Sequence, residues 1–287
     1  MADSNETPSS PFMPMFEEFR KELDEHHDRR ERVIKASRDV TASSKKIIFT
    51  LQRIRTLGAT IPAFATKNNA QYWETIQKQY QSIATDVQGI NAYRYPQITG
   101  GNQEFMEALS FQHYLENQTL ISYEEARSKV ASMSGEGPDV LLTPEDYILG
   151  IFDMIGELMR FSITCIATNG KLPAGRVKKT AKSVSGDGAQ NGDQMDVDQP
   201  DSKPTEEAEP RNVLSDLREI RLQLEMFEAP DEEEKFYAEV ERKMSVMRQC
   251  VNKVEKALYS LTVRGKERPK GWVPDVREER PTAVEGY

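Results

Sequence analysis

The stretch that most restricts the fold of this chain runs from Phe16 to Ile54 and contains neither proline nor glycine. Apolar side chains recur along it at helical spacing, at Phe16, Phe19, Leu23, Val33, Val40, Ile47, Leu51 and Ile54. This spacing places one apolar stripe along an α-helix. The stretch therefore predicts a single helix of about 40 residues, far longer than the average helix in globular proteins.

The rest of the apolar pattern is also helical. Further helices are expected at 68–91, at 97–116, from residue 122 onward, and at 143–170, 211–227 and 240–261. The motif "SYEE" predicts a capping box in which Ser122 caps and Glu125 reaches back, and "TPED" predicts a helix start capped by Thr143. No strand-like alternation is present. We therefore expect an all-α fold, a bundle of about seven long antiparallel helices.

The acidic residues of the chain are concentrated in one segment. Between residues 183 and 209, eight acids and one lysine contribute −7 of the net charge of −9. This segment lacks aromatic residues and cannot bury enough apolar surface to offset chain entropy. The expected organisation is therefore a disordered N-terminus at 1–11, a helical bundle at 12–170, a disordered acidic insertion at 171–209, the last two helices at 210–270 and a flexible tail at 271–287.

The chain is expected to have no membrane association. No run approaches the roughly 18 to 20 apolar residues of a membrane span, and the start "MADSNETPSSPF" is too polar for a signal peptide. Cys165 and Cys250 fit two free, reduced thiols. The basic run from Arg176 to Lys182 is a weak candidate for nuclear import. We expect a cytoplasmic and nuclear protein.

The sequence "FDMIGELMRF" places two carboxylates one helical turn apart in an otherwise apolar run. On a helical wheel, Asp153 and Glu157 fall in a polar stripe of about 80°. The other members of this stripe are Asp146, Gly150, Arg160 and Thr164. An ordinary surface helix is polar over about half its girth, so this helix is expected to be buried on most sides.

A second pair of carboxylates, Glu104 and Glu107, shares one face of an earlier helix, just after Gly100 and Gly101. The two glycines permit close approach of another backbone or a ligand. Carboxylates without nearby cysteine or histidine ligands suit a hard cation such as Mg²⁺ or Mn²⁺. The candidate catalytic and metal-binding residues are therefore Glu104, Glu107, Asp153 and Glu157. The alternative is that these acids face solvent and that Arg160 simply pairs with Glu157.

A basic stretch from Arg29 to Lys46 carries seven bases and two acids. One interpretation is a solvated helix face. The other is contact with a phosphate backbone, in which case the candidate nucleic-acid-binding residues are Arg32, Lys35, Arg38 and Lys46.

Four blocks of the sequence resemble the translin family in the order in which that family has them. They are "FRKELDEHHDRRERVIKASRDVTASSKKIIFTLQRI", "GNQEFMEALSFQHYL", "LTPEDYILGIFDMIGELMR" and "VEKALYSLTVRG". The resemblance covers about Phe16 to Lys270 except the acidic insertion. It is stronger to the branch that associates with translin than to translin itself, which lacks the first acid of the pair Asp153 and Glu157.

The resemblance implies a specific function. Members of that branch join translin in a closed, hollow hetero-oligomer. The assembly is a metal-dependent endoribonuclease, a hydrolase that cleaves single-stranded or nicked RNA, including passenger strands in RNA interference and fragments in tRNA processing. Single-stranded DNA is a second candidate ligand. The family's motifs place the catalytic acids at Glu104, Glu107, Asp153 and Glu157, with Mg²⁺ or Mn²⁺ as cofactor.

Two other functions remain open at this level. The chain could serve as a non-catalytic nucleic-acid-binding or scaffold partner of translin, whose exposed helical seams recruit translin and whose acids are only structural. It could also serve as a coiled-coil adaptor without a nucleic-acid role. That function explains the long helices but not the narrow acidic stripe.

Overall fold

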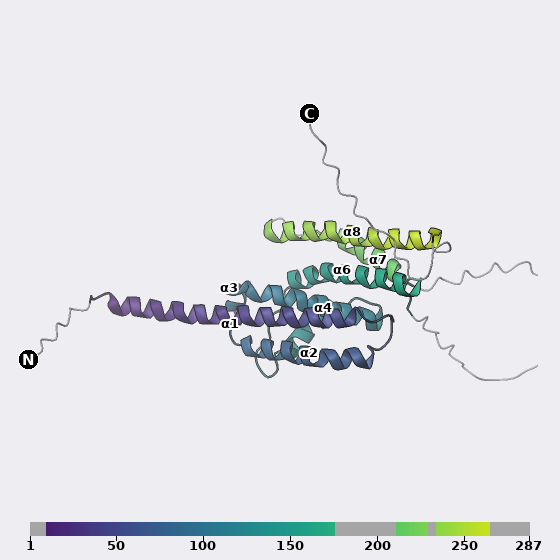
Figure 1. Cartoon of the computed structure of the whole chain (residues 1–287). Helices are drawn as coiled ribbons and strands as arrows, with labels where there is room; N and C mark the ends of the chain where they lie inside the picture. The colour runs from purple at the N-terminus through teal and green to yellow at the C-terminus, as the bar shows by residue number, and fades with distance from the viewer. Residues whose placement is uncertain (1–9, 176–210, 229–233, 265–287) are drawn as a thin grey trace, which may run out of the picture.

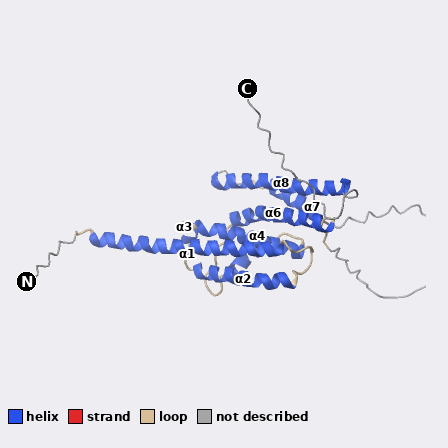
Figure 2. Cartoon of the chain, in the orientation of Figure 1, coloured by secondary structure: helices blue, strands red, loops and turns tan. Residues whose placement is uncertain are grey.

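The computed structural model describes residues 10–175, 211–228 and 234–264 of the chain. Its elements are α1 Met13–Leu51, α2 Ala63–Ile83, α3 Asn91–Arg94, the 3₁₀ turn η1 Pro96–Ile98, α4 Thr99–Asn117, α5 Tyr123–Met133, α6 Pro144–Asn169, α7 Val213–Glu225 and α8 Glu234–Arg264. Helices dominate the described residues, which form no strand (Figure 2). The expected all-α helical bundle is confirmed.

The long helices are stacked in layers (Figure 1). α1 packs against α2 and α4, α4 packs against α6, and α6 packs against α8. α7 covers part of both α6 and α8. α1 and α2 run in opposite directions, since Asp39 contacts Gln79 and Lys46 contacts Tyr72. The neighbours α4 and α6 run in the same direction: Asn102 contacts Asp146 near their starts, and Phe111 contacts Phe161 further along.

Local sequence signals set several helix ends as predicted. Ser122 and Glu125 form the capping box of α5. Thr143 Oγ1 accepts a hydrogen bond from the backbone amide of Asp146 at 3.1 Å, and Gly170 ends α6 in the left-handed conformation with φ of 66°. The predicted helix at 68–91 is wrong at its end, because α2 stops at Ile83. The chain then turns through Gly89, whose φ is 57°, into α3 and η1.

The apolar seam of α8 is buried within this chain. Met244, Met247 and Val251 are all buried, and α8 packs on α6 and α7. The expectation that an exposed seam recruits translin is therefore wrong for these residues. The helix expected at 240–261 is therefore present, but its apolar face is covered by other helices of the same chain.

The start of α1 differs from the rest of the helix. Its first half projects beyond the other helices (Figure 1). Phe16, Phe19 and Leu23 are exposed there, and burial of the apolar stripe begins at Val33. The helical spacing thus predicted the length of α1, but only its second half contributes to the core.

Residues on either side of the acidic segment lie next to each other. The amide of Gly175 donates to the carbonyl of Arg211, and the amide of Val213 donates to the carbonyl of Pro173, both at 3.2 Å. Most of the predicted insertion at 171–209, the basic run 176–182, the tail 271–287 and residues 1–9 of the predicted N-terminal segment lie outside the described residues.

None of the described helices is both long enough and apolar enough to cross a bilayer.

Candidate active site

Small residues allow α4 to lie close to both α1 and α6. A Cβ added at Gly150 would come 2.5 Å from Cβ of Met106 and 3.0 Å from the carbonyl oxygen of Gln103. At Gly101, an added Cβ would lie 3.1 Å from backbone atoms of Ser37. The close approach expected near Gly100 and Gly101 is thus a contact with the backbone of α1, and Gly150 provides the equivalent contact between α4 and α6.

The close and parallel packing of α4 and α6 brings both carboxylate pairs to one cleft of about 510 Å³. Glu104 and Glu107 reach it from α4, and Asp153 and Glu157 reach it from α6. The other lining residues are Lys45 and Ile48 of α1, Phe152, Gly156 and Arg160 of α6, and Val246 of α8. All four candidate acids therefore lie on the same cavity.

Three of these four acids already have basic partners. Glu104 lies 3.0 Å from Nζ of Lys45. Asp153 accepts from Nζ of Lys243 with both carboxylate oxygens, at 2.5 and 2.6 Å. These ion pairs come from α1 and α8, so the cleft carries positive as well as negative charge.

Glu157 is the most buried of the four acids and is held by two side chains. It pairs with Arg160, one turn further along α6, as the alternative interpretation of the sequence expected. Gln52 Nε2 also donates to its Oε2 at 2.7 Å and to its backbone carbonyl at 2.9 Å. The carboxylate is therefore fixed in orientation at the edge of the cleft.

Glu107 is different, because within the described residues its carboxylate makes no ion pair or hydrogen bond. Burial, together with the negative charges of Asp153 and Glu104, raises its pKa to about 7 against the opposing effect of Arg160 and Lys243. A carboxylate in such surroundings lacks a compensating positive charge. A cation bound in the cleft would supply it.

The cleft carboxylates are of the chemical type that binds a hard cation, but their oxygens are not arranged around a common point in this structure. Across the described ranges, no three Asp, Glu, His or Cys side chains lie close enough together to hold one metal ion. The oxygens of Glu104 and Asp153 are turned toward lysine ammonium groups instead. Oxygen ligands of this kind suit Mg²⁺ or Mn²⁺ once those lysines give way.

The four basic candidates of α1 do not form a uniform patch. Arg32 donates to both carboxylate oxygens of Asp86, at 2.8 and 2.9 Å. Lys46 lies over the ring of Tyr72 at 5.2 Å. Lys35 and Arg38 are exposed, and in the described part of the chain they make no ion pair. Only these last two have charges that remain free for a phosphate backbone.

Sequence reasoning missed three residues of the site: Lys45, Gln52 and Lys243. Lys45 lies within the basic stretch that the sequence singled out, directly before Lys46. Lys243 directly precedes Met244 of the α8 seam, and no local motif marks it. Their roles depend on which helices pack together, which the local sequence does not show.

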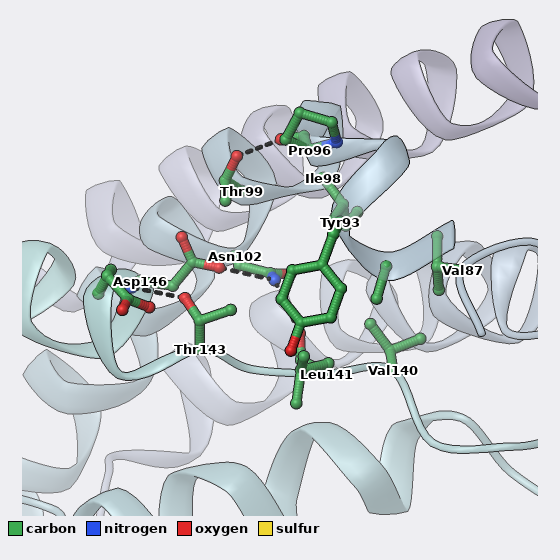
Figure 3. Close-up of a pocket in the computed structure, with 12 residues that line it drawn as sticks. Val87, Tyr93, Pro96, Ile98, Thr99, Asn102, Val140, Leu141, Thr143 and Asp146 are labelled. Atoms are coloured by element: carbon green, nitrogen blue, oxygen red, sulfur yellow. Dashed lines mark hydrogen bonds between the residues drawn. The ribbon is translucent and has the colours of Figure 1, made fainter. Parts of the chain in front are cut away.

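A second cavity, of about 280 Å³, lies at the start of α6 between α3, η1 and the segment before α6 (Figure 3). Asp146, which the helical wheel placed in the acidic stripe, is buried here. It accepts from Asn102 Nδ2 at 3.0 Å and from Gln103 Nε2 at 3.3 Å. Burial raises its pKa to about 6 despite these hydrogen bonds. Because its carboxylate is already hydrogen-bonded by two side chains of α4, Asp146 serves to join α4 to α6.

The comparison with known families agrees with the geometry of the main cleft. The sequence profile of the Translin family matches residues 28–265, which include all four cleft carboxylates. The chain belongs to the translin family.

Individual translin-family relatives support this assignment. The chain is 31% identical to translin-associated protein X of Rattus norvegicus and of Mus musculus, over 93% of this chain and 84% of theirs. It is also 31% identical to a translin-associated protein X homolog of Schizosaccharomyces pombe, over 52% of this chain and 61% of that protein.

Solved structures show the translin-like fold. Apo-NeC3PO has a TM-score of 0.54 and 17% identity over 86% of this chain and 97% of its own. AfC3PO in complex with duplex RNA has a TM-score of 0.52 and 16% identity over 88% of this chain and 100% of its own. At this level of identity, the likeness concerns the arrangement of the helices.

Proposed function

We propose that this chain is the catalytic subunit of a Mg²⁺-dependent endoribonuclease that contains translin and cleaves single-stranded or nicked RNA. The observation that carries the proposal is the cleft between α4 and α6, where four carboxylates meet and Glu107 has no basic partner among the residues that the structure describes. The similarity to proteins named for their association with translin supports the choice of partner. The related AfC3PO structure with duplex RNA supports RNA as the ligand class.

The ligands of the cation would be Glu104, Glu107, Asp153 and Glu157, with Mn²⁺ as the alternative ion. When bound, the ion would polarise a backbone phosphate and lower the pKa of a water molecule. Gln52 orients Glu157 through the hydrogen bond to Oε2. Ile48, Phe152 and Val246 form the apolar part of the cleft wall.

Two basic side chains stand where a phosphate would approach. The side chains of Lys45 and Arg160 both line the cleft and are both 63% exposed. Because both side chains are largely exposed, their charged groups can exchange the carboxylate for the phosphate of a bound strand. Lys35 and Arg38 lie on the same helix as Lys45 and extend the positive charge along α1. The proposed strand path therefore runs along α1 into the cleft.

The proposal is tested with the full-length chain reconstituted with translin. Glu107→Gln and Asp153→Asn remove one carboxylate charge each while keeping the side-chain shape. Each should lower Mg²⁺-dependent RNA cleavage by about 100-fold or more, because ligands that act as a unit are not replaceable singly. Assembly, followed by size-exclusion chromatography with light scattering, should be unchanged.

The matched control is Glu74→Gln, since Glu74 is exposed on α2 away from the cleft. Its activity should equal that of the wild-type complex, and chelation of Mg²⁺ should stop cleavage by both. If Glu107→Gln and Asp153→Asn cleave as fast as the wild type, the catalytic assignment is wrong. Comparing a nicked duplex, an intact duplex and a single strand tests the substrate part of the proposal.

The alternative is a non-catalytic nucleic-acid-binding or scaffold partner of translin. The ion pairs of Glu104, Asp153 and Glu157 favour it, because paired carboxylates can serve structure alone. It predicts RNA binding without Mg²⁺-dependent cleavage by this subunit. The catalytic proposal also includes passenger strands and tRNA fragments as substrates, which can be tested in cells with the same variants. It further includes a cytoplasmic and nuclear location, which can be tested by imaging the full-length protein in cells.

A further inference from the structure

Lys243 is a nearly buried lysine beside the carboxylate cleft, where it contacts the cleft residue Asp153. It is only 8% exposed, and its ammonium contacts both oxygens of Asp153. Burying a charge is costly unless it is paired, so lysine is rarely found in such a position. The neighbouring Met244 belongs to the buried seam of α8, which anchors the backbone that carries Lys243.

The other bases of the cleft are held differently. The side chains of Lys45 and Arg160 are 63% exposed, against 9% for that of Lys243. Exposed pairs of this kind contribute little to stability and open readily to solvent. Lys243 is therefore the one base of the three whose charge the fold holds inside the protein.

Lys243 has a second carboxylate within reach of its ammonium group. Glu239, one turn earlier on α8, lies 3.9 Å from its Nζ. Glu239 also contacts Arg242, and rotation of the lysine stem toward it would let the ammonium leave Asp153 without moving α8. The same ammonium can thus hold Asp153 or release it.

We propose that Lys243 is a resident counter-ion that competes with the divalent cation for Asp153 and so sets the metal affinity of the cleft. This inference rests on the proposed function, since it takes Asp153 as a metal ligand. While Lys243 contacts both oxygens of Asp153, neither oxygen is free for a metal ion. Metal binding therefore requires the ammonium to give up at least one of these oxygens, and the cost of that exchange weakens the binding of the metal.

The test is a Mn²⁺ titration of the complex with translin, without RNA, followed by the electron paramagnetic resonance signal of free Mn²⁺. Lys243→Met removes the competing charge and keeps the apolar stem. It should bind Mn²⁺ at least about 10-fold more tightly than the wild type, whereas a purely structural role would leave the affinity unchanged or lower. The control Lys45→Met removes an exposed base and should change the affinity by less than about 3-fold.

Each outcome bears on one of the two proposals. Tighter binding by Lys243→Met, or binding detected only in that variant, supports the exchange. If the wild type binds Mn²⁺ and Lys243→Met binds it equally well or more weakly, the inference is overturned but the proposed function is not. If neither protein binds Mn²⁺, or if Asp153→Asn binds as well as the wild type, the metal site itself is wrong. If Lys243→Met does not assemble, Lys243→Gln provides the same comparison.

Discussion

Gly150 of α6 faces Met106 of α4 without room for a side chain, since a Cβ at position 150 would lie 2.5 Å from Cβ of Met106. Glu107 directly follows Met106, and Asp153 lies one turn beyond Gly150. The contact therefore sets the distance between the two helices at the level of the carboxylates. It links the packing of the core directly to the geometry of the cleft.

Gly150→Ala should separate α4 from α6 and disturb both stability and activity. Overpacking a well-packed contact costs about 1–3 kcal/mol, which urea denaturation of the complex can measure. RNA cleavage should fall because the carboxylates move apart. The matched control is Gly156→Ala on the same helix, where an added Cβ meets no atom within 4 Å. Alanine there should stabilise the protein by roughly 0.5–1 kcal/mol. Equal changes in the free energy of unfolding for Gly150→Ala and Gly156→Ala would contradict the packing argument.

The raised pKa of Glu107 predicts how stability depends on pH in the metal-free protein. The ordinary pKa is 4.5 and the folded value is about 7, so the folded state binds the proton more tightly than the unfolded state. This contribution to stability is complete below about pH 4.5 and is lost as pH rises through 7.

Glu107→Gln removes this titration and should flatten that part of the pH profile. Between pH 5 and pH 8, the stability of the variant relative to wild type should rise by about 1–3 kcal/mol. Urea denaturation at the two pH values measures the difference, and Glu74→Gln serves as the control with no change expected. A constant difference between Glu107→Gln and wild type would show that Glu107 has an ordinary pKa.

The buried carboxylate of Asp216 should be essential for the attachment of α7. It accepts from the hydroxyl of Tyr114 at 2.6 Å and from Gln118 Nε2 at 2.8 Å, and it pairs with Arg211. Asp216→Ala leaves the buried hydroxyl of Tyr114 without an acceptor and should cost about 1–3 kcal/mol. Glu219→Ala removes the exposed second partner of Arg211 and should cost less than about 1 kcal/mol. Similar losses in thermal unfolding would contradict this distinction.

The basic candidates of α1 should divide into two groups when RNA binding is measured. Lys35→Ala combined with Arg38→Ala should weaken binding of single-stranded RNA and reduce the salt slope by about 0.7 for each phosphate that is no longer neutralised. Arg32→Ala should instead lower stability, because it leaves Asp86 without its bidentate partner. Fluorescence anisotropy over a range of salt concentrations, together with thermal unfolding, separates the two effects. Equal salt slopes for all variants would exclude Lys35 and Arg38 from the strand path.

Helix identity and the faces of the carboxylates were predictable because they depend on residues close together in the sequence. The spacing of Asp153 and Glu157 places them on one side of a helix wherever that helix packs. Caps such as Ser122 with Glu125 act within one turn, so the motif and the structure agree. The end of α2 was missed because Val87 continues the helical spacing of apolar residues. In the structure Val87 is buried, but it lies in a turn after the helix.

The charge balance of the cleft was decided only by the tertiary structure. Lys243 lies 90 residues from Asp153, and Gln52 lies 105 residues from Glu157. Electrostatic and hydrogen-bond partners of this kind act over a few ångströms in space, and no periodicity in the sequence encodes which helices come within that range. The sequence by itself determined the helices and the four acids on them. The packing of α1, α4, α6 and α8 determined which acids are paired and left Glu107 without a partner in the described part of the chain.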